Sequence, residues 1–152
     1  MRPLFVGAVG VIAHSLTEGR AFYVDAIGLP LVQAEGTSFL HSEKLEGSKY
    51  FGVWPLSEAA KACFGSEIWP AERHVPQMFI EFEMDSPESV AAAASELKSK
   101  GYDLLHGART DPWGQTVARL QTSDGLIVAV SFVPWMHRNP KMKTKRTIRS
   151  RR

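Results

Sequence analysis

Apolar and polar residues follow two different spacings along the chain, and the change from one to the other predicts its elements. Residues 5–13 are rich in glycine and β-branched side chains, which predicts a strand. The apolar face of residues 15–27 has a helical spacing, with Ser15 or Thr17 as the cap and Gly28 after its end. Three short strands are expected next, in the segments LPLVQA, TSFLHSE and SKYFGVWPL.

The same order of elements begins again at residue 78. The segment MFIEFEM predicts a strand, and residues 85–101 form the clearest helical segment, with Ser86 as N-cap, Pro87 in the first turn and Gly101 at the end. The segments YDLLHGA, GQTVARLQT and LIVAVSFV predict three further strands. A Ser-Asp-Gly turn joins the last two as a hairpin.

This repeat divides the chain into four parts. Residues 1–56 form a first βαβββ module and residues 78–137 form a second. Residues 57–77 form a linker that starts with a short alanine-rich helix, and residues 138–152 form a basic tail. Each module has one helix, which covers one face of its strands, so the other face has to pack on something or enclose something. The sequence therefore predicts an α+β fold.

Composition narrows the class of protein. The chain has 152 residues, of which 44% are hydrophobic, as expected for one globular domain or two halves that share a core. Its single cysteine, Cys63, excludes an internal disulfide and indicates a reducing compartment, so we expect a cytoplasmic protein. No apolar run reaches the roughly 18 residues that a membrane helix needs, so no membrane partner is expected.

The net charge of +2 conceals an uneven distribution. Residues 138–152 contain eight lysines and arginines and no acid, whereas residues 1–137 carry a net charge of −6. A basic terminus of this kind is typical of a disordered, solvated segment. We expect contact with nucleic acid only as a non-specific property of this tail.

Three segments carry a family resemblance: RAFYVDAIGLPLV, FEMDSPESVAAAASELKSKGYDLL and DPWGQTVARLQTSDGLIVAV. In this order and spacing they resemble the vicinal oxygen chelate superfamily, which includes glyoxalase I, bleomycin-resistance proteins and extradiol dioxygenases. The resemblance implies two βαβββ modules, a glyoxalase/bleomycin-resistance-like fold, with curled mixed sheets that enclose a cavity. It also implies a homodimer.

In metal-dependent members of this superfamily, the first and last strands of each module supply the ligands. The corresponding positions here hold Ala8, Phe79 and Ala129, and the segment KYFGVWPL contains no acid or histidine. Such metals need several oxygen or nitrogen ligands around one point. We therefore expect no metal and no other cofactor. The alternative is a divalent metal whose ligands lie in a different strand register.

If Ala8 and Phe79 hold the ligand positions, strand alternation turns a set of side chains into the cavity. The inward set is Ala8, Gly10, Ile12, His14, Phe79, Glu81, Glu83, Asp85, Ile127, Ala129, Ser131 and Val133. Four tryptophans, each next to a proline, add flat surfaces for stacking. The ligand-binding candidates are Trp54, Trp69, Phe79, Glu81, Glu83, Trp113 and Arg119. Acidic and aromatic groups together suit a small cationic or aromatic molecule.

Structural roles remain open for these residues. Glu81 and Glu83 alternate with apolar residues, as they would on a strand with one solvent face. Trp54 and Trp135 also suit a core or a dimer interface, and Trp113 also suits its turn.

A second function is open as well. A lyase or isomerase of glyoxalase type needs a general base, and the catalytic candidates are Glu81, Glu83 and His14. Bleomycin-resistance-type members of the superfamily, by contrast, sequester drugs without chemistry. The sequence contains no Ser-His-Asp, P-loop or dinucleotide motif that would indicate another reaction.

Overall fold

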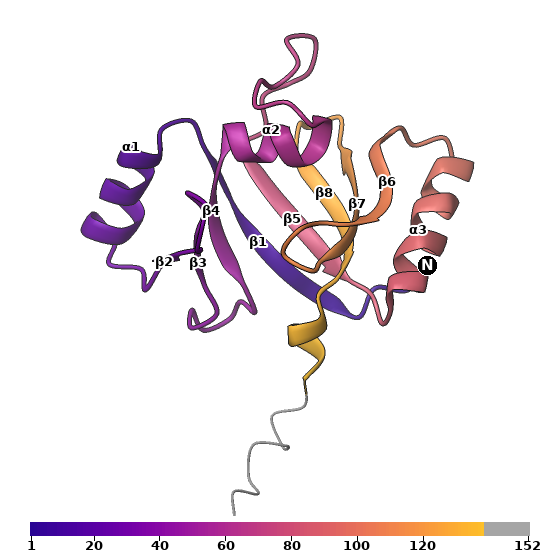
Figure 1. Cartoon of the computed structure of the whole chain (residues 1–152), viewed down its shortest axis with the longest axis horizontal. Helices are drawn as coiled ribbons and strands as arrows, with labels where there is room; N and C mark the ends of the chain where they lie inside the picture. Colours follow the sequence, from indigo (N-terminus) through magenta and orange to yellow (C-terminus); the bar gives the residue numbers. More distant parts are fainter. Residues whose placement is uncertain (139–152) are drawn as a thin grey trace, which may run out of the picture.

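The computed structural model of the protein describes residues 1–138 and has the α+β architecture expected from the sequence (Figure 1). The basic tail lies outside the described residues, apart from Arg138. The first half contains β1 (Phe5–Ala13), α1 (Leu16–Arg20), the π-helix η1 (Ala21–Ala26), β2 (Val32–Gln33), β3 (Leu40–Ser42) and β4 (Phe51–Pro55). The second half contains α2 (Leu56–Phe64), β5 (Met78–Glu83), α3 (Pro87–Ser99), β6 (Leu104–Thr110), β7 (Thr116–Gln121), β8 (Ile127–Phe132) and the 3-10 helix η2 (Pro134–His137).

Local sequence signals account for the ends of α2 and α3. The hydroxyl of Ser86 accepts the backbone N–H of Ser89 at 3.1 Å, and Pro87 is the first residue of α3, where no N–H partner is needed. Gly65 follows α2 with a φ of 76°, in the left-handed region that glycine occupies without steric cost. The cap predicted from the sequence therefore starts α3, and a glycine ends α2.

The helix expected over residues 15–27 is split into two kinds of helix. After one turn of α1 the chain widens into η1, and the N–H of Ile27 donates to the carbonyl of Phe22, five residues back, at 2.9 Å. Tyr23 and Val24 of η1 pack against the buried cluster of Leu31, Leu40 and Val53. The π-helical turn therefore carries two of the residues that cover this cluster.

All eight strands form a single mixed sheet with the order β2-β3-β4-β1-β5-β8-β7-β6. β1 runs parallel to β4, β5 runs parallel to β8, and β1 pairs antiparallel with β5. The β1–β5 pair therefore joins the two halves within one chain. The sequence led us to expect a separate sheet for each module; the structure instead has one continuous, open sheet.

Helices cover both faces of this sheet. On one face, η1 packs against β3 and β4, and α3 packs against β7 and β8, at opposite ends of the sheet in Figure 1. On the other face, α2 packs through Ala59, Ala60 and Cys63 against a cluster that includes Trp54 and Phe79. Within residues 1–138, no helix combines the length and apolar character needed to cross a membrane.

The central strands bring four positions into one row across the sheet. Ala8 of β1 lies opposite Glu81 of β5, Glu81 pairs with Ala129 of β8, and Ala129 pairs with Arg119 of β7. A register shift between Val6 and Ala8 precedes this row. Small residues thus alternate with long charged ones, which leaves space above the sheet between Glu81 and Arg119.

Two glycines allow neighbouring groups to approach the sheet closely. A Cβ at Gly10 would lie 2.1 Å from the carbonyl oxygen of Gly52 and 2.6 Å from the ring of Phe79. A Cβ at Gly52 would lie 2.4 Å from the ring of Phe39. Both rings therefore rest directly on glycine backbone, and β1 and β4 pack more tightly than side chains would permit.

We predict that Gly10→Ala destabilises the fold by about 3 kcal/mol, because the new methyl group would clash with the backbone carbonyl of Gly52, which can move only if the paired strands shift. The matched control is Gly107→Ala in β6, where a Cβ would meet nothing within 4 Å. Urea unfolding of both variants measures the difference. Equal unfolding midpoints for the two variants would contradict this account of Gly10.

Candidate functional site

A cavity of about 210 Å³ lies on the α2 side of the sheet. Its walls are mainly aromatic: Phe39, Tyr50, Trp54, Phe79, Trp113 and Trp135. The acidic lining residues are Glu35, Glu58 and Glu81, and Arg119 is the one cation that lines the cavity within the described part of the chain. The site is therefore an apolar, ring-walled pocket with a few charged groups.

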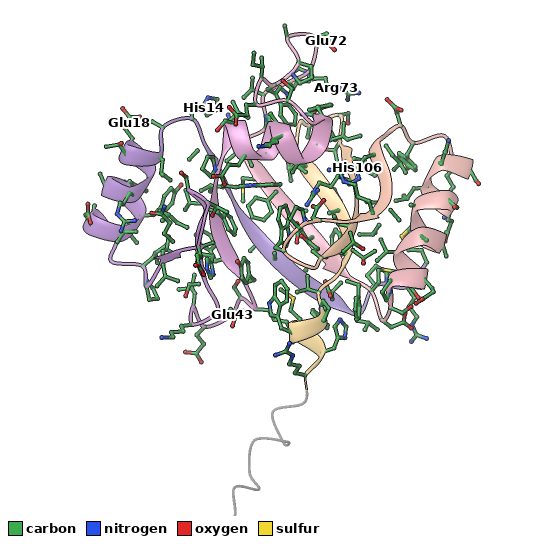
Figure 2. The ribbon with its side chains drawn as sticks, viewed as in Figure 1. His14, Glu18, Glu43, Glu72, Arg73 and His106 are labelled. Atoms are coloured by element: carbon green, nitrogen blue, oxygen red, sulfur yellow. The ribbon has the colours of Figure 1, made fainter. Side chains whose placement is uncertain are left out.

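Five of the ligand-binding candidates read from the sequence meet in this cavity: Trp54, Phe79, Glu81, Trp113 and Arg119. Two others, Trp69 and Glu83, do not line it. His14 lies just after β1, where it is exposed and also outside the lining (Figure 2). Of the three catalytic candidates, the structure therefore brings only Glu81 to the cavity.

Glu81 occupies the middle of the site. Its Oε2 accepts a hydrogen bond from the side-chain amide of Gln115 at 2.8 Å, and its Oε1 has no hydrogen-bond partner among residues 1–138. Burial raises the pKa of this carboxyl, while Arg119 and the Gln115 hydrogen bond act in the opposite direction. The side chain can therefore exchange a proton at a higher pH than an exposed glutamate.

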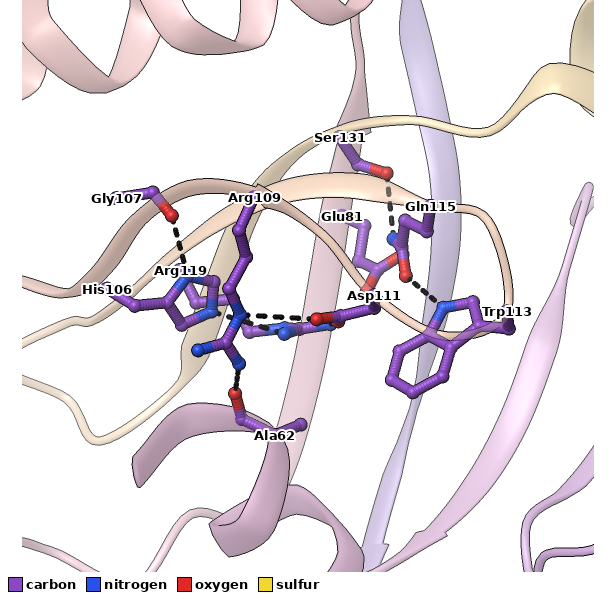
Figure 3. A network of polar contacts seen from close by, with 10 residues as sticks. All are labelled: Ala62, Glu81, His106, Gly107, Arg109, Asp111, Trp113, Gln115, Arg119 and Ser131. Carbon is purple, nitrogen blue, oxygen red and sulfur yellow. Dashed lines mark hydrogen bonds and ion pairs between the residues drawn. The ribbon is translucent and has the colours of Figure 1, made fainter. Parts of the chain in front are cut away.

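Gln115 connects Glu81 to the rest of the wall (Figure 3). Its amide nitrogen also donates to the hydroxyl of Ser131 at 2.8 Å, and its amide oxygen accepts the indole N–H of Trp113 at 2.7 Å. Gln115 is only 4% exposed, so all its polar atoms are satisfied inside the protein. Gln115 is not among the residues predicted from the sequence, because a single glutamine after Pro-Trp-Gly carries no signal of a binding role.

Arg119 forms the charged floor of the cavity beside Trp54 and Trp113. It is 1% exposed and donates to Asp111 at 2.9 Å. Its guanidinium carbon lies 5.5 Å from the ring centroid of Trp54 and 6.0 Å from that of Trp113, which are cation–π distances. Its Nε is buried without a hydrogen-bond partner among the described residues.

His106 completes the surroundings of Arg119. Its Nε2 lies 3.2 Å from an Arg119 nitrogen and its Nδ1 lies 2.7 Å from the carbonyl oxygen of Gly107. Burial, together with the positive charges of Arg119 and Arg109, lowers the pKa of His106 to about 4, although the hydrogen bond to Gly107 acts in the opposite direction. The neutral ring therefore accepts from Arg119 at Nε2 and donates from Nδ1–H to Gly107.

Asp111 ties the cavity floor to α2. It accepts from Arg119 and, at 3.2 Å, from the Nε of Arg109. Arg109 also donates to the carbonyl of Ala62 in α2 (Figure 3). Cys63 lies next to this carbonyl, is buried, and has its pKa raised to about 11 by burial. Cys63 therefore remains a protonated thiol that packs in the core.

Glu83 and Trp69 support the walls instead of lining them. Glu83 Oε1 accepts the backbone N–H of Val133 and lies 3.0 Å from Nε2 of His137, which anchors the segment that carries Trp135. Burial raises the pKa of Glu83, although both of these hydrogen bonds oppose the shift. The indole N–H of Trp69 donates to the carbonyl of His74 at 2.9 Å and so closes the loop between α2 and β5.

The donors around Glu81 do not fit the divalent metal that the resemblance associates with this fold. Ala8, Phe79 and Ala129 hold the expected ligand positions and provide no ligand atom. Glu81 is the carboxylate of this row, and Gln115 already occupies one of its oxygens. No group of three or more His, Cys, Asp or Glu side chains within residues 1–138 could hold a metal ion.

The eight-stranded sheet and its cavity define a class of paired βαβββ proteins. The family pattern of the Glyoxalase/Bleomycin resistance protein/Dioxygenase superfamily matches residues 6–130, and the chain belongs to this superfamily. No curated protein sequence matches the chain.

Solved structures agree with this assignment. A superfamily member from Vibrio splendidus superposes with a TM-score of 0.55 at 14% identity, over 86% of this chain and 99% of that one. A variant of Streptomyces coelicolor methylmalonyl-CoA epimerase, in complex with 2-nitronate-propionyl-CoA, gives 0.56 at 18% identity, over 88% and 96%. The Mn(II)-bound glyoxalase from Novosphingobium aromaticivorans gives 0.54 at 14% identity, over 86% and 38%. At these identities the likeness establishes the fold alone.

We predict that Asp111→Asn destabilises the protein by about 3–5 kcal/mol, because it leaves the buried guanidinium of Arg119 without its countercharge. The matched control is Asp124→Asn in the exposed turn before β8, which we expect to change stability by less than about 0.5 kcal/mol. Urea unfolding measures both values. Similar losses for the two variants would show that the Arg119–Asp111 pair does not hold the floor.

Glu81 should also make stability depend on pH. Because its pKa is raised in the folded state, the folded protein binds the proton more tightly than the unfolded chain, and stability falls as the pH rises through that range. We predict that Glu81→Gln raises the midpoint temperature of unfolding at pH 7. Each kcal/mol added to the free energy of unfolding corresponds to a rise of about 2–4 °C. Near pH 4 we expect the variant and the unmodified protein to have the same midpoint temperature. Differential scanning calorimetry at both pH values checks this, and a gain independent of pH would contradict it.

Proposed function

We propose that the protein binds a small aromatic or cationic molecule in this cavity, without a metal. The observation that carries the proposal is a ring-walled cavity with a carboxyl group, Glu81, that has one oxygen left for a ligand. A cavity of about 150 Å³ already holds benzene in another protein, so about 210 Å³ suits a molecule of one ring and a substituent.

The charges of the lining favour a cation over an anion. Three carboxyl groups, those of Glu35, Glu58 and Glu81, line the cavity. Arg119 is paired with Asp111, which it shares with the more exposed Arg109, so the wall compensates part of its positive charge. Aromatic faces add a further attraction for positive charge, worth about 0.5–2 kcal/mol for each good contact.

A glyoxalase-type lyase or isomerase is the second candidate function. The position of Glu81 favours it, because a buried carboxylate with a raised pKa is suited to accept a proton from carbon. In such a step the C–H bond beside a carbonyl breaks, the proton moves to Glu81, and the electron pair moves to the carbonyl oxygen as an enolate.

The homodimer, the cytoplasmic location and the non-specific contact of the tail with nucleic acid stay predictions.

Three planar probes of nearly equal size test the binding proposal: benzamidine, benzamide and benzoate. We expect benzamidine to quench tryptophan fluorescence and raise the midpoint temperature of unfolding at pH 7.5, benzamide to bind about tenfold more weakly, and benzoate not to bind. Glu81→Gln should weaken benzamidine by about tenfold and leave benzamide unchanged, because it removes the charge alone. The matched control is Glu88→Gln on the exposed first turn of α3.

Two further measurements separate the alternatives. Benzamidine affinity should be the same with and without EDTA, and its loss on chelation would contradict a metal-free site. Exchange of deuterium into pyruvate or a propionyl thioester, followed by NMR and lost in Glu81→Gln, would favour the isomerase. Tighter binding of benzoate than of benzamidine would overturn the proposed ligand class.

A further inference from the structure

The side chains of Trp113 and Gln115 meet because of a tight turn between β6 and β7. The N–H of Asp111 donates to the carbonyl of Gln115 at 2.8 Å, and the N–H of Gly114 donates to the carbonyl of Asp111 at 2.9 Å. Gly114 has a φ of 89°, which permits the turn at that residue. The indole and the amide, two residues apart, are therefore held side by side by the backbone.

The indole determines which way the amide of Gln115 faces. An indole N–H can only donate, so the atom of Gln115 at 2.7 Å from Trp113 Nε1 has to be the amide oxygen. The two hydrogens of the amide nitrogen then point to Oε2 of Glu81 and to Oγ of Ser131, both at 2.8 Å. A reversed amide would place two donors, the indole and the NH₂ group, against each other.

The amide in turn determines which oxygen of Glu81 carries a proton. Oε2 receives the N–H of Gln115, which favours an unprotonated oxygen at that position. Oε1 has no hydrogen-bond partner among residues 1–138, and Glu81 lines the cavity. The proton of the neutral acid, or the free lone pairs of the carboxylate, are therefore presented by Oε1.

We infer that Trp113 and Gln115 are positioning residues that hold the Glu81 carboxyl with Oε1 available to the cavity, and that the site selects ligands carrying an N–H donor next to an aromatic ring. The ligand class rests on the proposed function, whereas the positioning role rests on the hydrogen bonds alone. Trp113 is 48% exposed and also lines the cavity, so its ring contacts the ligand while its N–H fixes the amide.

Other ionisable groups near Glu81 are separate from this chain of hydrogen bonds. They are Arg119 from β7, Asp111 from the turn before β7, Glu83 from the same strand, and Tyr50, which precedes β4. Phenylalanine at position 113 keeps an aromatic ring beside the Arg119 guanidinium, which still pairs with Asp111, and removes only the indole N–H that Gln115 accepts. A change in the titration of Glu81 that the Trp135→Phe variant does not share therefore reports the orientation of the amide.

The test compares Trp113→Phe with Trp135→Phe, since both remove an indole from the cavity lining and only the first removes the donor to Gln115. The carboxyl of Glu81, assigned by its absence in Glu81→Gln, is titrated by carbon-13 NMR in ligand-free protein. We expect its pKa to rise in Trp113→Phe, because the freed amide can turn its oxygen toward the carboxylate. We expect no change in Trp135→Phe, and an unchanged titration in both variants would overturn the inference.

Gln115→Met provides an independent check, because it removes the amide and keeps the length of the side chain. We expect it to raise the pKa of Glu81, and the double variant Trp113→Phe/Gln115→Met to add nothing further, since the indole acts through the amide. If the pKa shifts of the two single variants add up in the double variant, the indole does not act through the amide, and that part of the inference is wrong. Thermal unfolding of each variant confirms that the fold is retained.

Benzamidine binding then separates the two claims. We expect Trp113→Phe to weaken benzamidine about fivefold or more beyond the loss in Trp135→Phe, and to weaken benzamide beyond that loss as well, because both probes carry an N–H donor next to the ring. Shifted titrations together with no benzamidine binding by the unmodified protein would contradict the proposed function and the ligand class, and would leave the positioning role supported. Unshifted titrations together with benzamidine binding would contradict the positioning role alone.

Discussion

The antiparallel pairing of β1 with β5 is the contact on which the rest of the structure depends. It joins the two halves into one sheet and sets small residues of β1 against large ones of β5, with Ala8 opposite Glu81 and Gly10 opposite Phe79. The cavity exists because the β1 positions add almost no volume above the sheet. A shift of this pairing by one residue would turn Glu81 to the opposite face and remove the carboxyl from the cavity.

Around that centre, charged groups are paired within the walls so that apolar surface can line the space. Arg119 and Asp111 join the floor to β6 and α2, while Glu83 and His137 hold the segment that brings Trp135 to the cavity. Each pair offsets much of the cost of burying its charges by hydrogen bonding. Glu81 differs, because its partner, Gln115, is neutral and its side chain lines the cavity, whereas the unpartnered Oε2 of Glu83 is buried within the wall.

Much of the fold was predictable because its signals are local. Ser86 and Pro87 start α3, Gly65 ends α2, and alternating apolar residues indicate each long strand. The single continuous sheet was not predictable in the same way, since a pairing between β1 and β5 joins residues some seventy positions apart. Likewise, the π-helical turn depends on the cluster against which it packs and has no sequence signal of its own.

The candidate site was predictable where alternation alone decides orientation. Phe79 and Glu81 followed from it, whereas alternation left the direction of Arg119 open. Glu83 has the same pattern as Glu81 but is covered by η2, which comes from a distant part of the chain. Strand geometry ends before His14, so alternation no longer applies there. Gln115 and Asp111 resemble ordinary turn residues, and their roles arise only once β6, β7 and β8 lie side by side.

The two ends of the open sheet have a consequence for how the protein behaves at high concentration. An exposed edge strand offers unpaired backbone groups on which other chains can build intermolecular β-structure. Here one edge, β2, is only two residues long, and the pairing of the other, β6, is interrupted by two register shifts. Neither edge presents a long, regular row of free donors and acceptors. The sheet can therefore stay open without acting as a template for fibrous aggregation.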